Sequence, residues 1–303
     1  MNKILDPDQV FESFTKKKIS KEEALNFLIT ILEKSENSKL RINSMRIIGN
    51  MSYKNERIFR ILENSLISDE IPEIRALSSD IIFNQYIQEG LNTLKWAIMN
   101  ENSAQVLCHF KSILYKNTKP SSILKNALDL RTRTIASNFD INIEEVQFLL
   151  DLGIQISINT LFKMNNQINY IYQENFMCVI ENKHIKEMNL TSYAEIPHSI
   201  GNLKTLETLN FSCNNLYELP IEFKNLTNLK NLDLSWNEFE EVPDELINLH
   251  SLQELNISNN SIIKVPEWIS TLENLIYLNI KGNEIEYIPN SIKSSKKIKF
   301  LYY

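Results

Sequence analysis

The C-terminal part of the chain has a regular pattern of hydrophobic and polar positions. From residue 206 onward the pattern repeats every 23 residues, and four full copies follow one another. A fixed period of this length indicates a solenoid, in which each unit buries its apolar face against the next unit. The copies begin at Leu206, Leu229, Leu252 and Leu275, and a fifth begins at Ile298.

Each copy follows the pattern LxxLxLxxNxLxxLPxxL almost without a break, with other apolar residues at some of the Leu positions, and this pattern predicts one short strand and a return segment. The alternation in LxLxL has period 2, so this part is expected to form a strand with one buried face. A buried Asn after the strand can bond backbone groups of adjacent turns and form a ladder, and the following Pro fixes φ where the return begins. The ladder and turn positions are Asn214, Asn237, Asn260, Asn283, Pro220, Pro243, Pro266 and Pro289.

This pattern closely resembles the leucine-rich repeat family in its 23-residue LPxxL subtype. Ras-suppressor-like and plant Ras-group proteins use that subtype. The resemblance covers about residues 176–303 and implies a curved α/β solenoid with a parallel sheet. The residues expected to close its core from the convex side are Phe223, Leu246, Ile269, Ile292, Leu226, Leu249 and Leu272.

One irregular copy precedes the regular ones. In HIKEMNLTSYAEIPHSIGNL, Ile185, Met188 and Leu190 fill strand positions, but the step from Met188 to Leu209 is 21 residues and no Asn fills the ladder position. An atypical first repeat is expected of a cap. The alternation in FMCVI and the turn signal ENK predict a hairpin with HIKEMNL that seals the N-terminal edge.

Residues 20–116 have helical periodicity and are expected to form an all-α region. Ser20 and Glu23 make a capping box before ALNFLITILEK, and Pro72 suits the first turn of a later helix. The helix pairs are expected at 20–34 with 38–52, 55–67 with 72–86, and 88–99 with 103–116.

The joints between the paired helices look alike. Arg41 and Arg75 lie 34 residues apart, and Leu107 takes the matching place 32 residues later. The joints resemble those of HEAT-type helical repeats, which carry the pattern D/E-x-x-x-[VI]-R-x-x-[AS]. The resemblance implies a structural role for Arg41 and Arg75, each bracing a neighbouring joint. An unrelated helical bundle is the alternative.

These patterns predict three domains: a HEAT-like helical domain over 1–118, a helical connector and cap region over 119–175, and the repeat domain over 176–303. In the connector, one helix is expected from Pro120 to about Ala136, and a second in INIEEVQFLLDLG ends before Gly153. The stretch 154–175 is expected to pack against the cap because its apolar residues need burial. These residues are Leu161, Phe162, Ile168, Tyr170 and Ile171.

Composition limits the chemistry that the chain can perform. The chain is 43% hydrophobic and 23% charged, as in ordinary globular proteins. Its five glycines are too scattered for a GxxxxGK[ST] or GxGxxG phosphate loop. The four histidines show no HxxxH or HExxH spacing, and the three cysteines form no CxxC site. We therefore predict no catalytic residue, no cofactor and no metal site, and a protein that is not an enzyme.

Charge and hydropathy limit the partners that the protein is expected to bind and the cellular compartment in which it is expected. Residues 176–303 hold 11 Lys and Arg and 17 Asp and Glu, a net charge of −6, whereas residues 1–175 hold 21 of each. The acidic part is expected to repel nucleic acid. The longest apolar stretch, near residues 24–32, is too short for a membrane span, and no signal peptide is visible. Widely spaced cysteines favour a reducing compartment, so we expect a cytoplasmic protein without membrane insertion.

Strand side chains that point away from the core form two columns, which we call the concave face. It grades from polar and acidic to aromatic, and exposed aromatic side chains on a rigid surface are typical binding anchors. The first column is Glu187, Thr208, Asn231, Glu254, Tyr277 and Phe300. The second is Asn189, Asn210, Asp233, Asn256, Asn279 and Tyr302, with Trp236 just past a strand. Alternatively, the polar residues only satisfy the repeat pattern and Trp236 covers the repeat edge.

The leading functional prediction is a non-enzymatic adaptor or scaffold that binds another protein on the concave face. The resemblance to Ras-group repeat proteins makes a small GTPase or its regulator one candidate partner. One alternative is a structural protein that forms a homodimer through the C-terminal strand FLYY. Another is a regulatory or substrate-recognition subunit of an enzyme complex.

Overall fold

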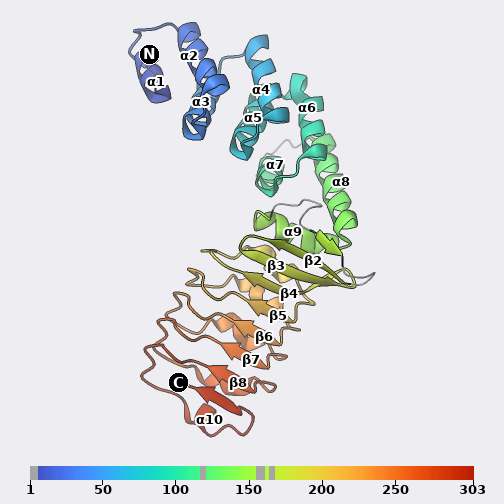
Figure 1. Ribbon diagram of the computed structural model, residues 1–303, viewed down its shortest axis with the longest axis vertical. Helices are drawn as coiled ribbons and strands as arrows, with labels where there is room; N and C mark the ends of the chain where they lie inside the picture. Colours follow the sequence, from blue (N-terminus) through green and yellow to red (C-terminus); the bar gives the residue numbers. More distant parts are fainter. Residues whose placement is uncertain (1–5, 117–120, 155–160, 164–167) are drawn as a thin grey trace. The chain divides into compact units, whose positions relative to one another are not determined.

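The computed structural model describes residues 6–116, 121–154, 161–163 and 168–303. The chain divides into two compact units, residues 1–131 and 132–303, and the boundary lies inside helix α8 (Figure 1). The three-part division into 1–118, 119–175 and 176–303 stays a prediction.

The first unit is helical. The predicted pairs are present as α2 with α3 and α4 with α5, and α6 is followed by α7, which packs on α5. Helix α1 was not predicted; Asp6 caps it by accepting a hydrogen bond from the Asp8 N–H at 2.9 Å. The helices are α1 (Pro7–Thr15), α2 (Lys21–Lys34), α3 (Ser38–Asn50), α4 (Glu56–Ser68), α5 (Pro72–Gln85), α6 (Ile87–Asn100), α7 (Ala104–Lys116) and α8 (Ser122–Phe139).

Local sequence signals start these helices. Ser20 and Glu23 form the predicted capping box at α2, and Asn55 accepts the Ile58 N–H at 2.7 Å to cap α4. Pro72 occupies the first turn of α5, where its missing N–H leaves no intrahelical bond unmade. The first two helix pairs are thus confirmed, whereas the third is corrected, because α6 and α7 each pack on α5 rather than mainly on one another. The HEAT-like identity of the helices stays a prediction.

The second unit contains a single sheet in which strand order follows chain order. Strands β1 to β4 are antiparallel, and β4 to β9 are parallel. The strands are β1 (Leu161–Lys163), β2 (Ile168–Gln173), β3 (Phe176–Glu181), β4 (His184–Leu190), β5 (Thr208–Asn210), β6 (Asn231–Asp233), β7 (Glu254–Asn256), β8 (Tyr277–Asn279) and β9 (Phe300–Tyr302).

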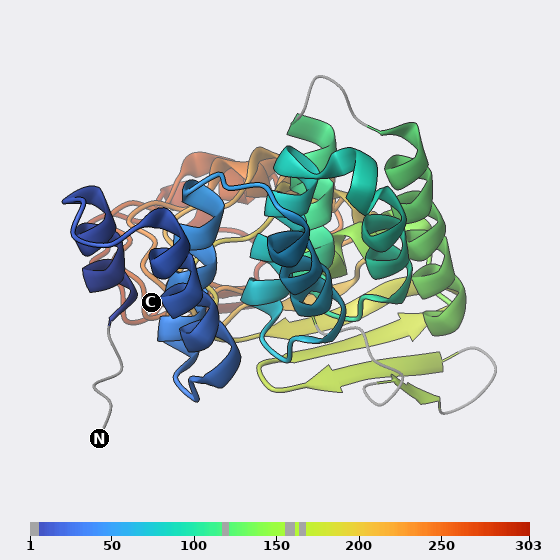
Figure 2. The ribbon, with the colours of Figure 1, turned by 90° about the horizontal axis from the view of Figure 1, so that it is seen from above.

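The predicted cap hairpin is confirmed as β3 paired with β4, and Met188 lies opposite Leu209 despite the 21-residue step. Strand β2 pairs with β3 and buries Ile171, so the described part of 154–175 extends the cap (Figures 1 and 2). Residues 155–160 and 164–167 of that stretch lie outside the described residues.

Helix α9 (Ile143–Asp151) is fastened to the hairpin by a buried carboxylate. Glu145 accepts the Ile185 N–H at 2.7 Å and lies 2.8 Å from Nδ1 of His184. Burial raises the pKa of Glu145, while these two hydrogen bonds oppose the rise. The predicted end of the helix is also confirmed, because Gly153 adopts a positive φ of 74° just after it.

A ladder of asparagines joins successive repeats, as predicted. Nδ2 of Asn237 donates to the carbonyls of Phe211 at 2.8 Å and Leu234 at 3.0 Å, and its Oδ1 accepts the Leu216 N–H at 3.0 Å. One of these carbonyls belongs to its own repeat and one to the preceding repeat. Asn214, Asn260 and Asn283 make the corresponding bonds.

Each turn proline begins a short helical return segment on the side of the core opposite the sheet. The seven residues predicted to close the core there are all buried. The return segments are η2 (His198–Asn202), η3 (Ile221–Asn225), η4 (Asp244–Asn248), η5 (Glu267–Thr271) and α10 (Asn290–Lys293).

The ladder supplies a stability prediction. Asn237→Ala leaves the buried N–H of Leu216 without a partner and removes one of the two amide donors to each of the carbonyls of Phe211 and Leu234. We therefore expect the free energy of unfolding of the repeat unit to fall by about 1–3 kcal/mol. Urea unfolding measures this loss. Asn225→Ala, at an exposed position in η3, is the control and is expected to change stability by less than about 0.5 kcal/mol. Equal losses in the two variants would contradict the ladder's role.

His109 supplies a pH prediction for the helical unit. Burial between α7 and α5 lowers its pKa, although Asp80 and the Ala76 carbonyl favour the charged form, and its Nε2 is buried without a hydrogen-bond partner. Because the unfolded chain binds the proton more readily, stability is expected to be full above about pH 6.5 and to fall as the pH drops below it. His109→Asn should flatten this dependence in unfolding curves, whereas His250→Asn, at an exposed site, should leave it unchanged.

Candidate functional site

The structure places the predicted strand residues of the concave face in two columns. In the first, Thr208, Asn231, Glu254, Tyr277 and Phe300 are register partners on successive parallel strands. Glu187 and Asn189 of β4 continue the two columns across the cap. The second column contains Asn210, Asp233, Asn256, Asn279 and Tyr302.

The middle of this face is hollowed over strands β5 to β8. The hollow is open to solvent, and polar side chains of both columns form most of its wall. Its lining residues are Thr208, Leu209, Asn210, Asn231, Leu232, Asp233, Glu254, Asn256 and Tyr277.

Hydrogen bonds between neighbouring strands hold the polar side chains of the hollow. Nδ2 of Asn256 donates to Oδ2 of Asp233 at 2.9 Å, and Nδ2 of Asn231 donates to Oγ1 of Thr208 at 3.3 Å. Oδ1 of Asp233 accepts both the N–H and the hydroxyl of Ser235. The Asp233 carboxylate therefore has a fixed orientation before any partner arrives.

Aromatic side chains occupy the C-terminal end of the face, as predicted. The rings of Tyr277 and Tyr302 lie 5.5 Å apart between centroids with an interplanar angle of 45°, a tilted arrangement that favours contact between aromatic rings. Phe300 is 52% exposed and Tyr302 is 47% exposed. The concave face thus has aromatic side chains next to a polar hollow.

Trp236 has a feature that the sequence analysis missed. It follows β6 with φ of 57°, in the left-handed region, and its side chain is 62% exposed. The residue before the ladder asparagine takes this conformation in all four regular repeats: Cys213, Trp236, Asn259 and Gly282. Gly and Asn at two of these places are the signal that could have revealed it. A bulky residue held there is strained, and the recurrence of this conformation shows that the turn of each repeat imposes it.

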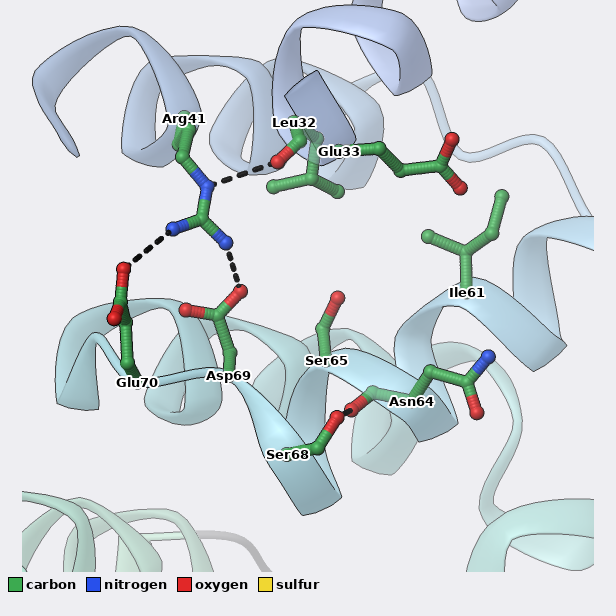
Figure 3. A pocket seen from close by; sticks show the side chains of 9 residues that line it. All are labelled: Leu32, Glu33, Arg41, Ile61, Asn64, Ser65, Ser68, Asp69 and Glu70. Atoms are coloured by element: carbon green, nitrogen blue, oxygen red, sulfur yellow. Dashed lines mark hydrogen bonds and ion pairs between the residues drawn. The ribbon is translucent and has the colours of Figure 1, made fainter. Parts of the chain in front are cut away.

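A second hollow lies in the helical unit, beside Arg41 (Figure 3). The Arg41 guanidinium reaches from α3 to the joint after α4, where it pairs with Asp69 and lies 3.5 Å from a carboxylate oxygen of Glu70. Its Nε also donates to the Leu32 carbonyl at 2.9 Å. All three nitrogens of the guanidinium therefore have a partner. The hollow thus lies beside a joint that Arg41 holds together.

The next joint is braced in the same way. Arg75 holds Glu101 through two hydrogen bonds of 2.8 Å and donates to the Asp69 carbonyl at 2.7 Å. Glu101 lies in the joint between α6 and α7, where the sequence has Leu107 in place of an arginine. Here Arg131 of α8 donates to the Glu101 carbonyl at 2.7 Å. Arg41 and Arg75 thus have the bracing geometry expected of structural residues.

The described residues contain no group of His, Cys, Asp or Glu side chains that could hold a metal ion. Cys178 is fully buried, and burial raises its pKa to about 12, so it remains a protonated thiol at neutral pH. In the part of the chain that the structure describes, the helices are all too short or too polar to cross a membrane.

Comparison with known proteins confirms the nature of the repeats. A family described as leucine-rich repeat region matches residues 163–257, and the family described as Leucine Rich Repeat matches residues 251–272. Residues 163–272 are therefore similar to leucine-rich repeats. These matches do not reach the helical unit. No curated protein matches the chain.

Solved structures with similarity to the chain include proteins described as leucine-rich repeat structures. A Leptospira interrogans protein is 34% identical over 40% of this chain and 31% of its own, with a TM-score of 0.38. A Listeria monocytogenes internalin is 25% identical over 39% of this chain and 34% of its own, with a TM-score of 0.35. The ectodomain of the Arabidopsis thaliana receptor kinase SOBIR1 is 21% identical over 54% of this chain and 93% of its own, with a TM-score of 0.40. The chain spans about a third of the length of the first two.

The left-handed conformation of Trp236 can be tested by a pair of substitutions. Trp236→Gly relieves the strain, so we expect stability to stay unchanged or rise by up to about 1 kcal/mol. Trp236→Val places a β-branched residue in the same conformation and should lower stability by about 1–2 kcal/mol. Urea unfolding measures both variants, and a glycine variant less stable than the valine variant would refute the assignment.

Proposed function

We propose that the protein is a non-enzymatic adaptor or scaffold that binds another protein on the concave face. The observation that carries this proposal is the aromatic end, formed by the half-buried Tyr277 and the exposed Phe300 and Tyr302, beside a hollow lined mostly by polar side chains. Aromatic anchors next to oriented polar groups are typical of protein interfaces. Trp236 adds a third exposed ring past the end of β6.

The rigidity of the face supports the same proposal. Its side chains stand on short parallel strands whose turns are fixed by the asparagine ladder. A preorganised surface loses little conformational entropy when a partner binds, so its contacts contribute to affinity with little loss from ordering. Extended solenoid surfaces are commonly used in this way.

The resemblance of the repeats to Ras-suppressor-like proteins makes a small GTPase or its regulator the first partner to test. That choice rests on similarity of fold. We place the interaction in the cytoplasm, because the buried thiol of Cys178 and the widely spaced cysteines suit a reducing compartment.

A capture experiment tests the binding face. The wild-type chain and a variant carrying Trp236→Gly, Tyr277→Ala and Phe300→Ala are used as baits in a lysate of the source cell. We expect a specific protein to be retained by the wild type and lost by the variant, because the exposed rings supply most of the anchor surface. Purified components then give the affinity, with an expected loss of at least about tenfold.

A matched control separates the concave face from general loss of aromatic surface. Tyr217→Ala with Tyr287→Ala removes two exposed rings that lie outside the two columns, and it should retain the captured protein. Circular dichroism and urea unfolding establish that every bait is folded. If the wild type and the concave-face variant retain the same proteins, the concave face is not the binding surface.

Self-association is the second candidate, and the exposure of Phe300 and Tyr302 on β9 favours it. Strand β9 pairs with β8 on one side only within the described residues. A strand with one unpaired edge can add a strand from a second copy. Sedimentation across a wide concentration range tests this, and a strictly monomeric protein would exclude it.

A further inference from the structure

The charged side chains of the concave face are all acidic. Its two columns hold the carboxylates of Glu187, Asp233 and Glu254, and they contain no lysine or arginine. Two lysines lie beside the first column, Lys186 within β4 and Lys230 just before β6. They flank the carboxylate of Glu207, with N–O distances of 3.1 and 2.5 Å, and this pairing offsets part of their charge.

Two of the three carboxylates lie in the hollow, and they differ in how they are held. Asp233 is fixed by Ser235 and Asn256 through three hydrogen bonds, whereas Glu254 is exposed and no hydrogen bond or ion pair engages its carboxylate within the described residues. The Asp233 carboxylate is therefore preorganised, whereas the Glu254 side chain is free to change its rotamer when a ligand binds.

An aromatic ring completes this arrangement. Tyr277 is the register partner of Glu254 on the adjacent strand, so the two side chains start about 4.8 Å apart. Tyr277 also lines the hollow, and its ring contacts that of Tyr302. A planar cation lying on the Tyr277 ring would have the carboxylate of Glu254 within reach, and Asp233 lies one strand beyond Glu254.

We propose that the concave face binds an arginine-bearing segment of a partner protein. One guanidinium group stacks on Tyr277 and donates hydrogen bonds to Glu254, while Asp233 attracts a neighbouring arginine of the same segment. This inference rests on the proposed function and specifies the chemistry of the partner.

Arginine suits the hollow better than lysine does. Its guanidinium is flat, so it can stack on an aromatic ring while its edge donates two parallel hydrogen bonds to a carboxylate. A lysine ammonium has the same charge but cannot make both contacts with one planar group. A phosphorylated or acidic partner would meet like charge over β6 and β7.

The position of nearby lysines limits where the partner's cations can lie. Lys281 follows β8 and Lys299 precedes β9, and both are exposed beside the aromatic end. Arginines of the partner are therefore expected over β6 to β8, and apolar residues of the same segment over Phe300 and Tyr302.

Peptide binding to the full chain tests this inference without knowledge of the natural partner. The probes are short glycine–serine peptides that carry arginines, the same number of lysines, or the same number of glutamates. Calorimetric titration at low and high salt should show that the arginine peptide binds most tightly, the lysine peptide at least about threefold more weakly, and the glutamate peptide not at all.

Variants locate the bound arginine. Glu254→Gln should weaken the arginine peptide roughly tenfold, and Tyr277→Ala should remove its advantage over the lysine peptide. The matched controls are Glu241→Gln and Tyr287→Ala, which make the same chemical changes at exposed positions outside the two columns. Neither control should change the affinity by more than about twofold.

The outcomes separate this inference from the proposed function. No binding of the arginine peptide, equal binding of the arginine and lysine peptides, or equal effects of Glu254→Gln and Glu241→Gln would overturn the arginine site. The adaptor function would still stand if a captured protein were lost on removal of the aromatic side chains. If that capture also failed, both proposals would fall together.

Discussion

The buried asparagine ladder is the interaction on which the repeat unit depends. Where each parallel strand ends, the chain turns away from the sheet and leaves carbonyls and N–H groups in the interior. Asn237 satisfies two carbonyls, one in its own repeat and one in the preceding repeat, and accepts the N–H of Leu216. Because each amide bonds across the boundary between repeats, it fixes the step from strand to strand. That step keeps the concave-face side chains in register.

The ladder has a second consequence, in the residue that precedes each asparagine. Its backbone must take a left-handed conformation, which glycine adopts without strain at Gly282. There, a Cβ would lie only 2.4 Å from Oδ1 of Asn259, so any other residue would also require the Asn259 side chain to move. At Trp236 the same conformation presents a large ring to solvent. The constraint that stabilises the turns therefore also positions one of the proposed anchors.

In the helical unit, charged side chains bond the backbone groups that lie at the joints between helices. Its joints expose helix ends, and Arg41 and Arg75 each bond a carbonyl and an acidic side chain of a joint. Glu101 receives Arg75 on its carboxylate and Arg131 on its carbonyl, while its carboxylate also accepts the N–H groups of Asn102 and Ser103. These carboxylates are well supplied with donors, which offsets the loss of water around a buried charge.

The sequence by itself determined the features that depend on local patterns. The 23-residue period placed the strands, the ladder and both columns, and the capping box of Ser20 with the alternation in FMCVI placed a helix and the cap hairpin, because each is encoded within a few residues. Tertiary structure alone decided contacts between distant segments. Arg131 replaces the arginine missing at Leu107, β2 extends the cap, and Asn256 orients Asp233, since these depend on how folded elements meet.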